Sequence, residues 1–392
     1  MEFRRLCKDD YDELLSVLNK TFGHKNGHEV DFLNEQPKMW VRDDEHMGRH
    51  YGIFEDGKLV SVTGMYPLHV RIGGVPLLFF TTGNVATLPE YEGRGYFTKI
   101  FTEIMKELER VGADGARLGG ARQRYARHGF QPAGTSYRMT FTEDNRVKYF
   151  GDGGTDITFR EIERDDIEAL KFVDGLYHTA KIYVERGTAE DYRDVYLSLG
   201  TKHCAGYLAL RGNEPIGYLA AQADNQFVGK SQNGRNILEM NAINTECYID
   251  ILCAWQRRVG LPLYLNIGAH RTDVITRLIP GVEGWFIQSP SHFKILNYEK
   301  LTDALLKIKD KNTMLHGSAV IEIEGYGKLE LYVNGDGAGC RRTDKDADIT
   351  LDRAEATRTL FGFTPPLAIA AKAPLLASWL PLPMSWDTLD YT

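Results

Sequence analysis

The sequence predicts an α/β protein in which one plan of strands and helices is used twice and a smaller α+β part follows. Hairpin-forming runs alternate with amphipathic helical segments through the first 297 residues. Residues 151–297 repeat the order of strand, helix, hairpin and helix that occurs in residues 1–150. From residue 298 the pattern changes to strands of alternating polarity. We therefore expect three domains, at 1–150, 151–297 and 298–392.

Composition supports a multidomain protein and excludes several classes. The 392 residues are 43% hydrophobic, and the net charge of −7 argues against a general nucleic-acid binder. The five cysteines form no Cys-x-x-Cys pair, so neither a zinc site nor a disulfide framework is indicated. The first six residues are too polar for a signal peptide, and the longest apolar stretch, 365–383, is interrupted by five prolines and Lys372. These features predict a cytoplasmic protein without a membrane span.

The first domain is expected to begin with a strand at residues 1–7 and an acid-capped helix that continues through Leu18. Two hairpins follow, and they turn at Asp56-Gly57 and at Gly73-Gly74. The second hairpin leads into an apolar strand that ends at Val85-Ala86-Thr87. A further strand is expected near residues 116–119.

The most informative stretch follows that strand. The loop Glu92-Gly93-Arg94-Gly95 precedes a helix whose apolar residues recur with a 3.6-residue period. These residues are Phe97, Ile100, Phe101, Ile104, Met105, Leu108 and Val111. A strand, a glycine-rich loop and a helix N-terminus together present free backbone N–H groups to a phosphate. Arg94 adds a positive charge, so we predict a pyrophosphate-binding loop.

The second domain keeps this plan but not the loop. Its hairpin turns at residues 211–214 and its helix covers 246–259, yet Met240-Asn241-Ala242-Ile243-Asn244 contains no Gly-x-Gly. In the third domain, strands are expected at 319–323, 329–333 and 347–351, and Asp352 is expected to cap a helix that stops at Gly362. The last 28 residues hold five of 14 prolines, which predicts a tail laid over other surfaces.

These residues resemble a known family. Val85-Ala86-Thr87, Glu92-Gly93-Arg94-Gly95 and the segment Tyr125-x-x-x-Gly129-Phe130 look like the acetyl-CoA motif and the following tyrosine segment of the GNAT superfamily of N-acetyltransferases. The first domain with this motif, a degenerate second copy and a C-terminal domain similar to sterol carrier proteins resemble the enhanced intracellular survival (Eis) family over essentially the whole chain.

The resemblance implies an acetyl-CoA site and two catalytic groups. Tyr125 would donate a proton to the departing thiolate, and the terminal carboxylate of Thr392 would accept the proton of the amine. No carboxylate lies on the strand at Val85-Ala86-Thr87 itself, and His128, Glu90 and Asp390 are alternative bases. The residues expected to bind acetyl-CoA are Val85, Ala86, Thr87, Gly93, Arg94, Gly95, Tyr96, Phe97, Thr98, Gly120 and Ala121.

The implied reaction is direct transfer of an acetyl group from acetyl-CoA to a primary amine, such as a cationic multi-amine or a lysine side chain. A homo-oligomer, hexameric by resemblance, is expected. The alternative is a non-catalytic protein that binds a lipid or another ligand, or senses acetyl-CoA, with relic acetyltransferase folds. Glu92 and Phe97 favour it, because the family usually has a hydrogen-bond donor and a small residue at these positions.

Metal sites are not expected. Asp344, Asp346, Asp348 and Glu355 have the spacing of a calcium loop, but Ile349 stands where its sharp turn needs glycine. The pairs His24–His28 and His46–His50 lie where no helical period is evident, and they lack a His-Glu-x-x-His pattern. We expect them to be solvated loop histidines.

Overall fold

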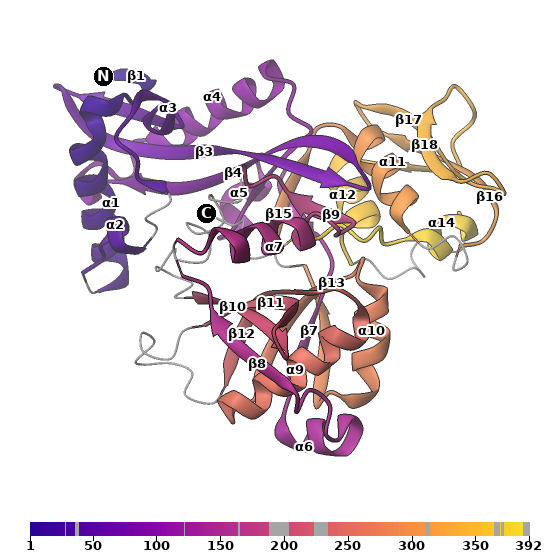
Figure 1. Ribbon diagram of the computed structural model, residues 1–392. Coiled ribbons are helices and arrows are strands. Elements are labelled where there is room, and N and C mark those ends of the chain that lie inside the picture. The colour runs from indigo at the N-terminus through magenta and orange to yellow at the C-terminus, as the bar shows by residue number, and fades with distance from the viewer. Residues whose placement is uncertain are drawn as a thin grey trace.

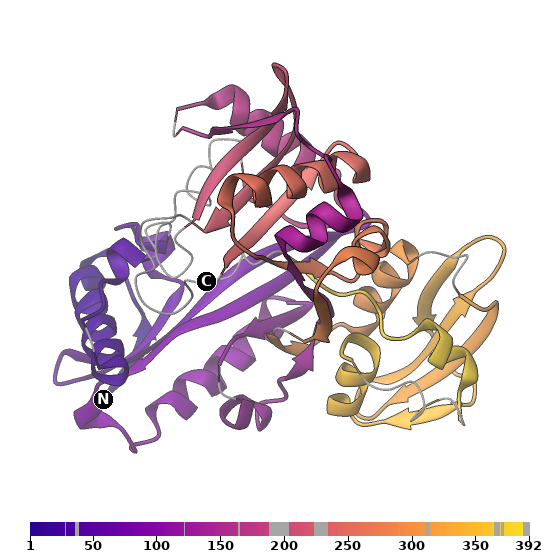
Figure 2. The same cartoon turned by 90° about the horizontal axis from the view of Figure 1, so that it is seen from below.

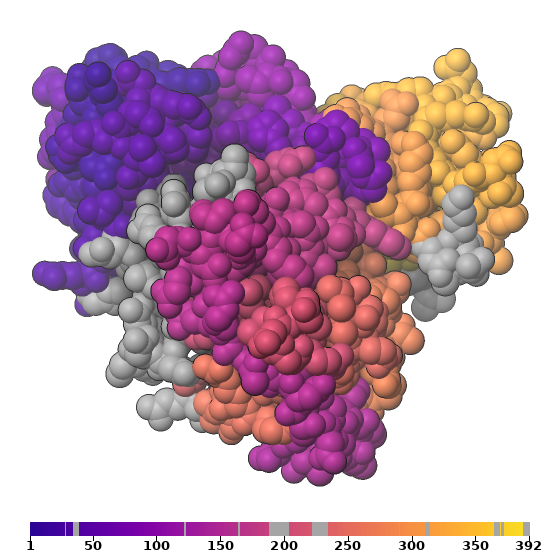
Figure 3. Space-filling model, viewed as in Figure 1, coloured from indigo at the N-terminus to yellow at the C-terminus, as the bar shows by residue number. Residues whose placement is uncertain are grey.

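The computed structural model describes residues 1–27, 29–35, 39–120, 122–163, 165–187, 204–222, 234–289, 291–309, 314–363, 369 and 372–386. Figures 1 and 2 show three parts, each built on its own sheet and flanked by helices. The predicted mixed α/β class is confirmed. In Figure 3 the C-terminal part, in yellow and orange, packs beside the other two. In the ranges given above, no helix is long and apolar enough to cross a membrane.

The first sheet has the strand order β1-β2-β3-β4-β5-β15-β6, and β9 pairs with β3. Its strands are β1 (Glu2–Arg5), β2 (His50–Glu55), β3 (Lys58–Ile72), β4 (Val75–Thr87), β5 (Gly115–Leu118), β6 (Gln131–Ala133), β9 (Ile182–Val184) and β15 (Ser291–Ile295). β4 and β5 are parallel, and the other pairs are antiparallel. The two predicted hairpins share β3, which is one strand of 15 residues because residues 64–72 stay paired with β4.

Helices cover both faces of this sheet. They are η1 (Lys8–Asp10), α1 (Tyr11–Asn26), α2 (Phe32–Glu35), α3 (Asp44–Met47), η3 (Pro89–Tyr91), α4 (Tyr96–Arg110) and α5 (Arg122–Ala126). The predicted apolar stripe of α4 is buried against Tyr51, Ile53 and Val60. α1 packs on the opposite face, against Val62 and Ala86. Burial on both faces fixes the end of β4, and with it the loop that leads to α4.

The second sheet has the order β14-β7-β13-β12-β11-β10-β8. Its strands are β7 (Ser136–Phe141), β8 (Ile157–Glu161), β10 (Cys204–Arg211), β11 (Glu214–Gln222), β12 (Arg235–Ala242), β13 (Leu263–Gly268) and β14 (Gly284–Gln288). Its helices are α6 (Glu143–Asn145), η4 (Arg146–Phe150), α7 (Ile167–Tyr177), α9 (Thr245–Val259), α10 (Thr272–Leu278) and η6 (Ile279–Gly281). The series β10–β11, β12, α9 and parallel β13 matches β2–β3, β4, α4 and parallel β5.

The two sheets exchange strands across the predicted domain boundaries. β7 precedes residue 150 but lies in the second sheet, between β14 and β13. β15 precedes residue 298 but lies in the first sheet, between β5 and β6. The division at 150 and 297 stays a prediction about folding units, while the sheets themselves are interlinked.

The C-terminal sheet has the order β18-β17-β16-β19. Its elements are α11 (Tyr298–Ile308), β16 (Gly317–Ile323), β17 (Gly327–Val333), β18 (Ala338–Arg342), β19 (Ile349–Leu351), α12 (Arg353–Phe361) and α14 (Pro374–Trp379). As predicted, Asp352 caps α12, where it forms a capping box with Glu355. The tail lies over the first sheet, since the Trp386 ring is 5.3 Å from the rings of both Phe79 and Phe293.

Candidate functional site

β4 leaves its neighbour β5 at a bulge. Asn84 has a left-handed φ of 51°, and the register with β3 shifts between Val62 and Gly64. The parallel pairing with β5 ends where Thr82 lies opposite Leu118, the last residue of β5. Residues 83–87 of β4 therefore extend beyond β5, and among the described residues no strand pairs with this edge, which we call the open edge of β4.

The open edge carries unpaired backbone groups of alternate residues. The N–H of Leu88 donates to Val60, and the carbonyl oxygen of Ala86 accepts from the Ser61 hydroxyl, so both residues face β3. Successive residues of a strand direct their backbone groups to opposite edges. Val85 and Thr87 therefore direct theirs away from β3, where an extended ligand can pair with them as an added strand does.

A buried hydrogen-bond network supports the bulge. The Asn84 amide donates to the Tyr66 hydroxyl over 2.6 Å, and this hydroxyl lies 2.8 Å from Nε2 of His50. Nδ1 of His50 lies 3.3 Å from the carbonyl oxygen of Met47, so the hydrogen bonds run from Asn84 through Tyr66 and His50 to Met47. Burial lowers the pKa of His50 to about 4 and raises that of Tyr66. The prediction that His50 is a solvated loop residue is wrong, because its side chain is fully buried.

The loop after β4 opens onto a cavity of about 380 Å³. Gly93 and Gly95 have φ values of 78° and 79°, which side chains rarely adopt. Gly95 is the N-cap of α4 and offers no side-chain acceptor, and the first turn contains no acidic residue. The first N–H groups of α4 thus lack an intrahelical acceptor and a capping side chain. The cavity is lined by Lys25, Val85, Thr87, Tyr91, Glu92, Gly93, Arg94, Gly95, Tyr96, Phe97 and Arg124.

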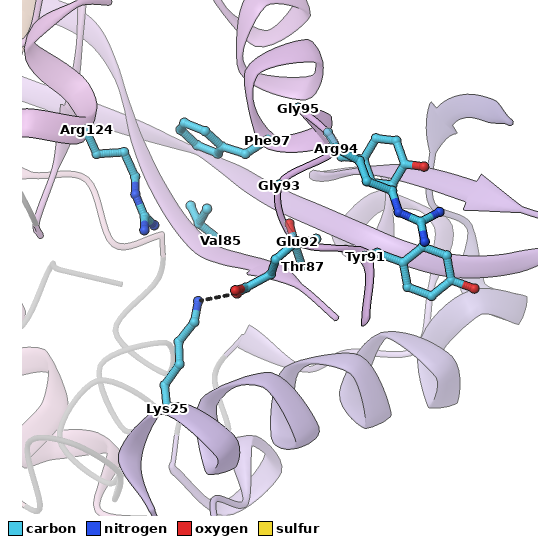
Figure 4. A pocket seen from close by; sticks show the side chains of 11 residues that line it. Lys25, Val85, Thr87, Tyr91, Glu92, Gly93, Arg94, Gly95, Phe97 and Arg124 are labelled. Carbon is cyan, nitrogen blue, oxygen red and sulfur yellow. Dashed lines mark ion pairs between the residues drawn. The ribbon is translucent and has the colours of Figure 1, made fainter. Parts of the chain in front are cut away.

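The charges around the cavity differ from the prediction. Figure 4 shows Lys25 of α1 and Arg124 of α5 on the same side of Val85, whereas Arg94 is turned to the other side. The Arg94 guanidinium lies 4.7 Å from the Tyr91 ring centre and 3.4 Å from a Glu55 oxygen. Arg94 lines the cavity, and its role beside the phosphates stays a prediction, with its guanidinium held by Tyr91 and Glu55 in this structure. Lys25 also lies 4.0 Å from the Glu92 carboxylate, which offsets the charge that Glu92 brings to the loop.

Tyr125 lies behind Phe97, next to the cavity. Its side chain is buried, and its ring centre is 5.8 Å from that of Phe97 and 5.6 Å from that of Phe101. Burial raises the pKa of Tyr125, so the phenol stays protonated at neutral pH. Phe97 thus separates Tyr125 from the loop and completes an aromatic wall. The alternative base His128 is half-buried and accepts a hydrogen bond from Arg127, and burial lowers its pKa.

The cavity unites most of the predicted binding residues. The cavity is lined by Val85, Thr87, Gly93, Arg94, Gly95, Tyr96 and Phe97 from this set. The remaining residues lie elsewhere: Ala86 is buried against α1, Thr98 accepts a hydrogen bond from Arg127, and Gly120 packs near Tyr125. Ala121 and Thr392 lie outside the described residues.

Lys25 and Arg124 were missed by the sequence analysis. Arg124 could have been predicted more easily than Lys25, because it belongs to the basic run Arg122-Gln123-Arg124 beside the tyrosine segment. Lys25 stands about 70 residues before the loop, and no spacing connects the two before the chain folds.

The second half of the chain contains the same framework in a closed form. Asn241 donates to the Tyr218 hydroxyl over 3.0 Å, as Asn84 does to Tyr66. However, the helix after β12 is capped, since the Asn244 side chain accepts from the N–H of Cys247. The cavity beside β12 measures only about 40 Å³.

Two arginines account for this closure. Arg271 donates to the Asn241 side chain over 2.9 Å, and Arg186 forms a buried ion pair with Glu239. The first half leaves the N-terminus of α4 and one edge of β4 free. In the second half, Asn244 caps α9, and Arg271 and Arg186 bind side chains of β12.

Two of the four acidic residues with calcium-like spacing have structural roles. Asp348 accepts a hydrogen bond from the N–H of Val320, and Glu355 belongs to the cap of α12. Within the described ranges, His, Cys, Asp and Glu side chains form no group of three or more that could hold a metal ion.

Comparisons with known proteins show what the first part of the chain resembles. Residues 2–133 match the family model described as acetyltransferase (GNAT) domain. No curated protein sequence matches the chain significantly.

Several solved structures share the fold over almost their entire length. A GCN5-related N-acetyltransferase from Kribbella flavida is 16% identical with a TM-score of 0.64, and covers 100% of this chain and 98% of its own. One from Anabaena variabilis ATCC 29413 is 13% identical with a TM-score of 0.67, covering 98% and 99%. Eis1 from Mycobacterium abscessus is 16% identical with a TM-score of 0.63, covering 100% and 97%.

Residues 2–133 thus resemble a GNAT acetyltransferase domain, and the complete chain shares its fold with these solved structures. This supports acyl-group transfer as the general class of activity. The sterol-carrier-like character of the C-terminal part stays a prediction.

Proposed function

We propose that this protein is an acetyl-CoA-dependent N-acetyltransferase that acts on a primary amine. One observation carries the proposal: the uncapped N-terminus of α4 and the open edge of β4 meet at one cavity in the first half. The corresponding features of the second half are capped and filled. We therefore place one acetyl-CoA site in the part of the chain that the structure describes, within the residues that match the acetyltransferase family.

The cavity suits the charged half of acetyl-CoA. Free N–H groups at the start of α4 and the positive end of the helix dipole stabilise a pyrophosphate, and the glycines allow close approach. Lys25 and Arg124 supply the side-chain charge that the prediction gave to Arg94. In this proposal Glu92 is tolerated because Lys25 lies beside it.

The open edge of β4 suits the pantetheine arm, whose amide groups can pair with the backbone of Val85 and Thr87. This edge begins at the Asn84 bulge, where β4 and β5 separate. The position of the bulge thus determines where the reactive end of the ligand lies. The hydrogen bonds of Tyr66 with Asn84 and His50 keep the bulge in place.

Tyr125 is the proposed proton donor to the leaving thiolate. Its raised pKa keeps the phenolic proton available at neutral pH. In the transfer, the amine nitrogen forms a bond to the acetyl carbon, the carbon–sulfur bond breaks, and the sulfur takes the Tyr125 proton. Cys204, Cys247, Cys253 and Cys340 are buried, which is consistent with direct transfer rather than a cysteine-bound intermediate.

The terminal carboxylate of Thr392 is the proposed proton acceptor, by resemblance to the Eis family. The position of Trp386 supports this role, because its ring packs against Phe79 near the start of β4. The six residues that follow it can span at most about 20 Å. The distance along β4 from Phe79 to Val85 is also about 20 Å, at ~3.3 Å per residue. A fully extended terminal segment is therefore long enough to bring the Thr392 carboxylate to Val85.

The finer assignments follow the resemblance to the Eis family. They are a cationic multi-amine or lysine-like acceptor, a sterol-carrier-like C-terminal domain, a homo-oligomer that is hexameric, and a cytoplasmic location. The net charge of −7 favours a cationic acceptor.

Release of CoA thiol from acetyl-CoA in the presence of a panel of polyamines, aminoglycoside-like multi-amines and lysine peptides tests the proposal. We expect amine-dependent turnover and a mass increase of one acetyl group on the accepted amine. Binding of acetyl-CoA without turnover on any amine would instead support a sensing protein. A variant with a few residues added after Thr392 should lose turnover and keep acetyl-CoA binding, and full activity would exclude the terminal carboxylate as the base.

A further inference from the structure

A second large cavity lies where the second sheet meets the C-terminal part, away from the β4 edge. It measures about 750 Å³, within the range of ~300–1,000 Å³ that is typical of small-molecule sites. Its wall comes from β7, β14 and α10 on one side and from the end of α11, Phe363, Pro381 and Pro383 on the other. In Figure 1, α10 appears at the lower right and α11 at the upper right.

Most of this wall is apolar. Tyr137 and Ile287 belong to the second sheet, while Ile308 ends α11 and Phe363 follows α12. The Phe363 side chain is exposed, which is uncommon for a phenylalanine at a junction between packed parts. The cavity thus offers an apolar surface large enough for an aromatic ring system or a short aliphatic chain.

Two lysines give the cavity a positive end. The Lys309 ammonium donates to the carbonyl oxygens of Trp379 and Pro381, and Lys181 donates to the carbonyl oxygen of Ile308. Among the described residues, no carboxylate lies within ion-pair distance of either ammonium. Burial lowers the pKa of Lys309 to about 8, so it remains mostly protonated at neutral pH. Lys309 is half-buried, and a cation partly removed from water without a counter-charge is costly, so a bound anion relieves that cost; Lys181 is exposed and adds positive charge at the rim of the cavity.

The remaining polar groups agree with an anionic ligand. Asp273 also lines the cavity, but its carboxylate accepts from Thr245 over 2.8 Å and lies 3.7 Å from Arg271. The Thr135 hydroxyl and Nδ1 of His270 are buried without a hydrogen-bond partner among the described residues. Burial lowers the pKa of His270 to about 3, so the ring is neutral and can hydrogen-bond without adding charge.

We propose that this cavity binds a small organic acid, with its apolar or aromatic body against Tyr137, Ile287 and Phe363 and its anionic group between Lys181 and Lys309. The body replaces water on the apolar wall, and the anion supplies the counter-charge that both ammonium groups lack. The Thr135 hydroxyl can donate a hydrogen bond to the same anion. The site goes beyond the proposed acetyl transfer and does not depend on it.

Two fluorescent probes with the same aromatic body test the proposal. Anilinonaphthalene sulfonate carries one anionic group, and phenylnaphthylamine carries none. We expect saturable binding of the sulfonate at one site per chain, about tenfold tighter than binding of the neutral probe. Excess CoA should leave it unchanged, which separates this site from the cavity at α4. Sulfonate binding that CoA abolishes would overturn the assignment.

Three variants and a control locate the site. Lys181→Met and Lys309→Met should each weaken sulfonate binding about tenfold and leave the neutral probe unaffected. Thr276→Trp, on the exposed face of α10, should fill the cavity and weaken both probes. Lys106→Met removes an exposed lysine of α4 and should change neither. If Lys309→Met fails to fold, Lys181→Met and Thr276→Trp decide the question. If the cavity variants bound the sulfonate probe as tightly as the Lys106→Met control does, the proposal would be overturned.

Discussion

The buried network behind the β4 bulge offers a sharp test of the site geometry. Tyr66→Phe removes one hydroxyl that accepts from Asn84 and pairs with His50. His50 is fully buried and Tyr66 nearly so, so water cannot replace the missing partner of His50 Nε2. Asn84 also loses the side-chain contact that favours its left-handed conformation.

The expected size of the effect follows from these two losses. A buried polar atom left without a partner costs about 1–3 kcal/mol. A non-glycine residue in the left-handed region is disfavoured by roughly 1–2 kcal/mol, so Asn84 is free to relax once its contact is lost. The unpaired His50 nitrogen therefore predicts a destabilisation of about 1–3 kcal/mol, and relaxation of Asn84 relieves strain rather than adding to this cost. Since small shifts of reacting groups reduce rates strongly, we expect kcat/KM to fall about 10- to 100-fold.

The second half supplies a matched control. Tyr218→Phe removes the equivalent hydroxyl, which accepts from Asn241 and donates to Glu239. Thermal melting should show comparable losses for the two variants, whereas acetyl-CoA binding and turnover should fall in Tyr66→Phe alone. If both variants lost activity equally, or if Tyr66→Phe kept full turnover despite a lower melting temperature, the bulge would not position the reaction.

Three further predictions concern individual side chains. Tyr125→Phe should reduce kcat about 100-fold while the Kd of acetyl-CoA, measured by calorimetry, stays within about twofold; a similar loss in both would assign the residue a structural role. Glu92→Gln should tighten acetyl-CoA binding about two- to fivefold at low salt, with a smaller gain at high salt; weaker binding would contradict the placement of the phosphates beside this loop. Burial lowers the pKa of folded His50 to about 4, whereas an unfolded histidine titrates near ~6.5, so its stabilising contribution is present above pH ~6.5 and is lost as the pH falls toward 4. At pH ~5 the loss is about 2 kcal/mol, and melting of His50→Gln should be less sensitive to acid than that of wild type; an equal slope would refute this assignment.

Much of the fold follows from local patterns in the sequence. The 3.6-residue period of α4, the Asp-Gly turn between β2 and β3, and the Asp352 cap are each encoded within a few residues. Periodicity also indicated that residues 151–297 repeat the first plan, and the structure places matching elements in both sheets. The exchange of β7 and β15 was beyond such reasoning, because pairing over more than a hundred residues leaves no local signal.

The candidate site was predictable in part for the same reason. Gly93 and Gly95 indicate the loop in the sequence, because only glycine readily adopts the positive φ values that the loop requires. The direction of a side chain is set by its neighbours, so Arg94 turns to Glu55 and Tyr91 although its position in the sequence favours the phosphates. His50 was expected in solvent because nothing in the sequence connects it to Tyr66, sixteen residues away on the next strand.

The contrast between the two halves leads to one direct measurement. Calorimetric titration of the chain with acetyl-CoA should give one binding site per chain, because α4 is uncapped and α9 is capped by Asn244. Gly95→Asn, which offers α4 a side-chain acceptor, should weaken that binding at least about tenfold, with a lower melting temperature because the left-handed φ of Gly95 strains a side chain. Two sites per chain, no binding at all, or undiminished binding by Gly95→Asn would contradict the proposal that acetyl-CoA is held at the free N-terminus of α4.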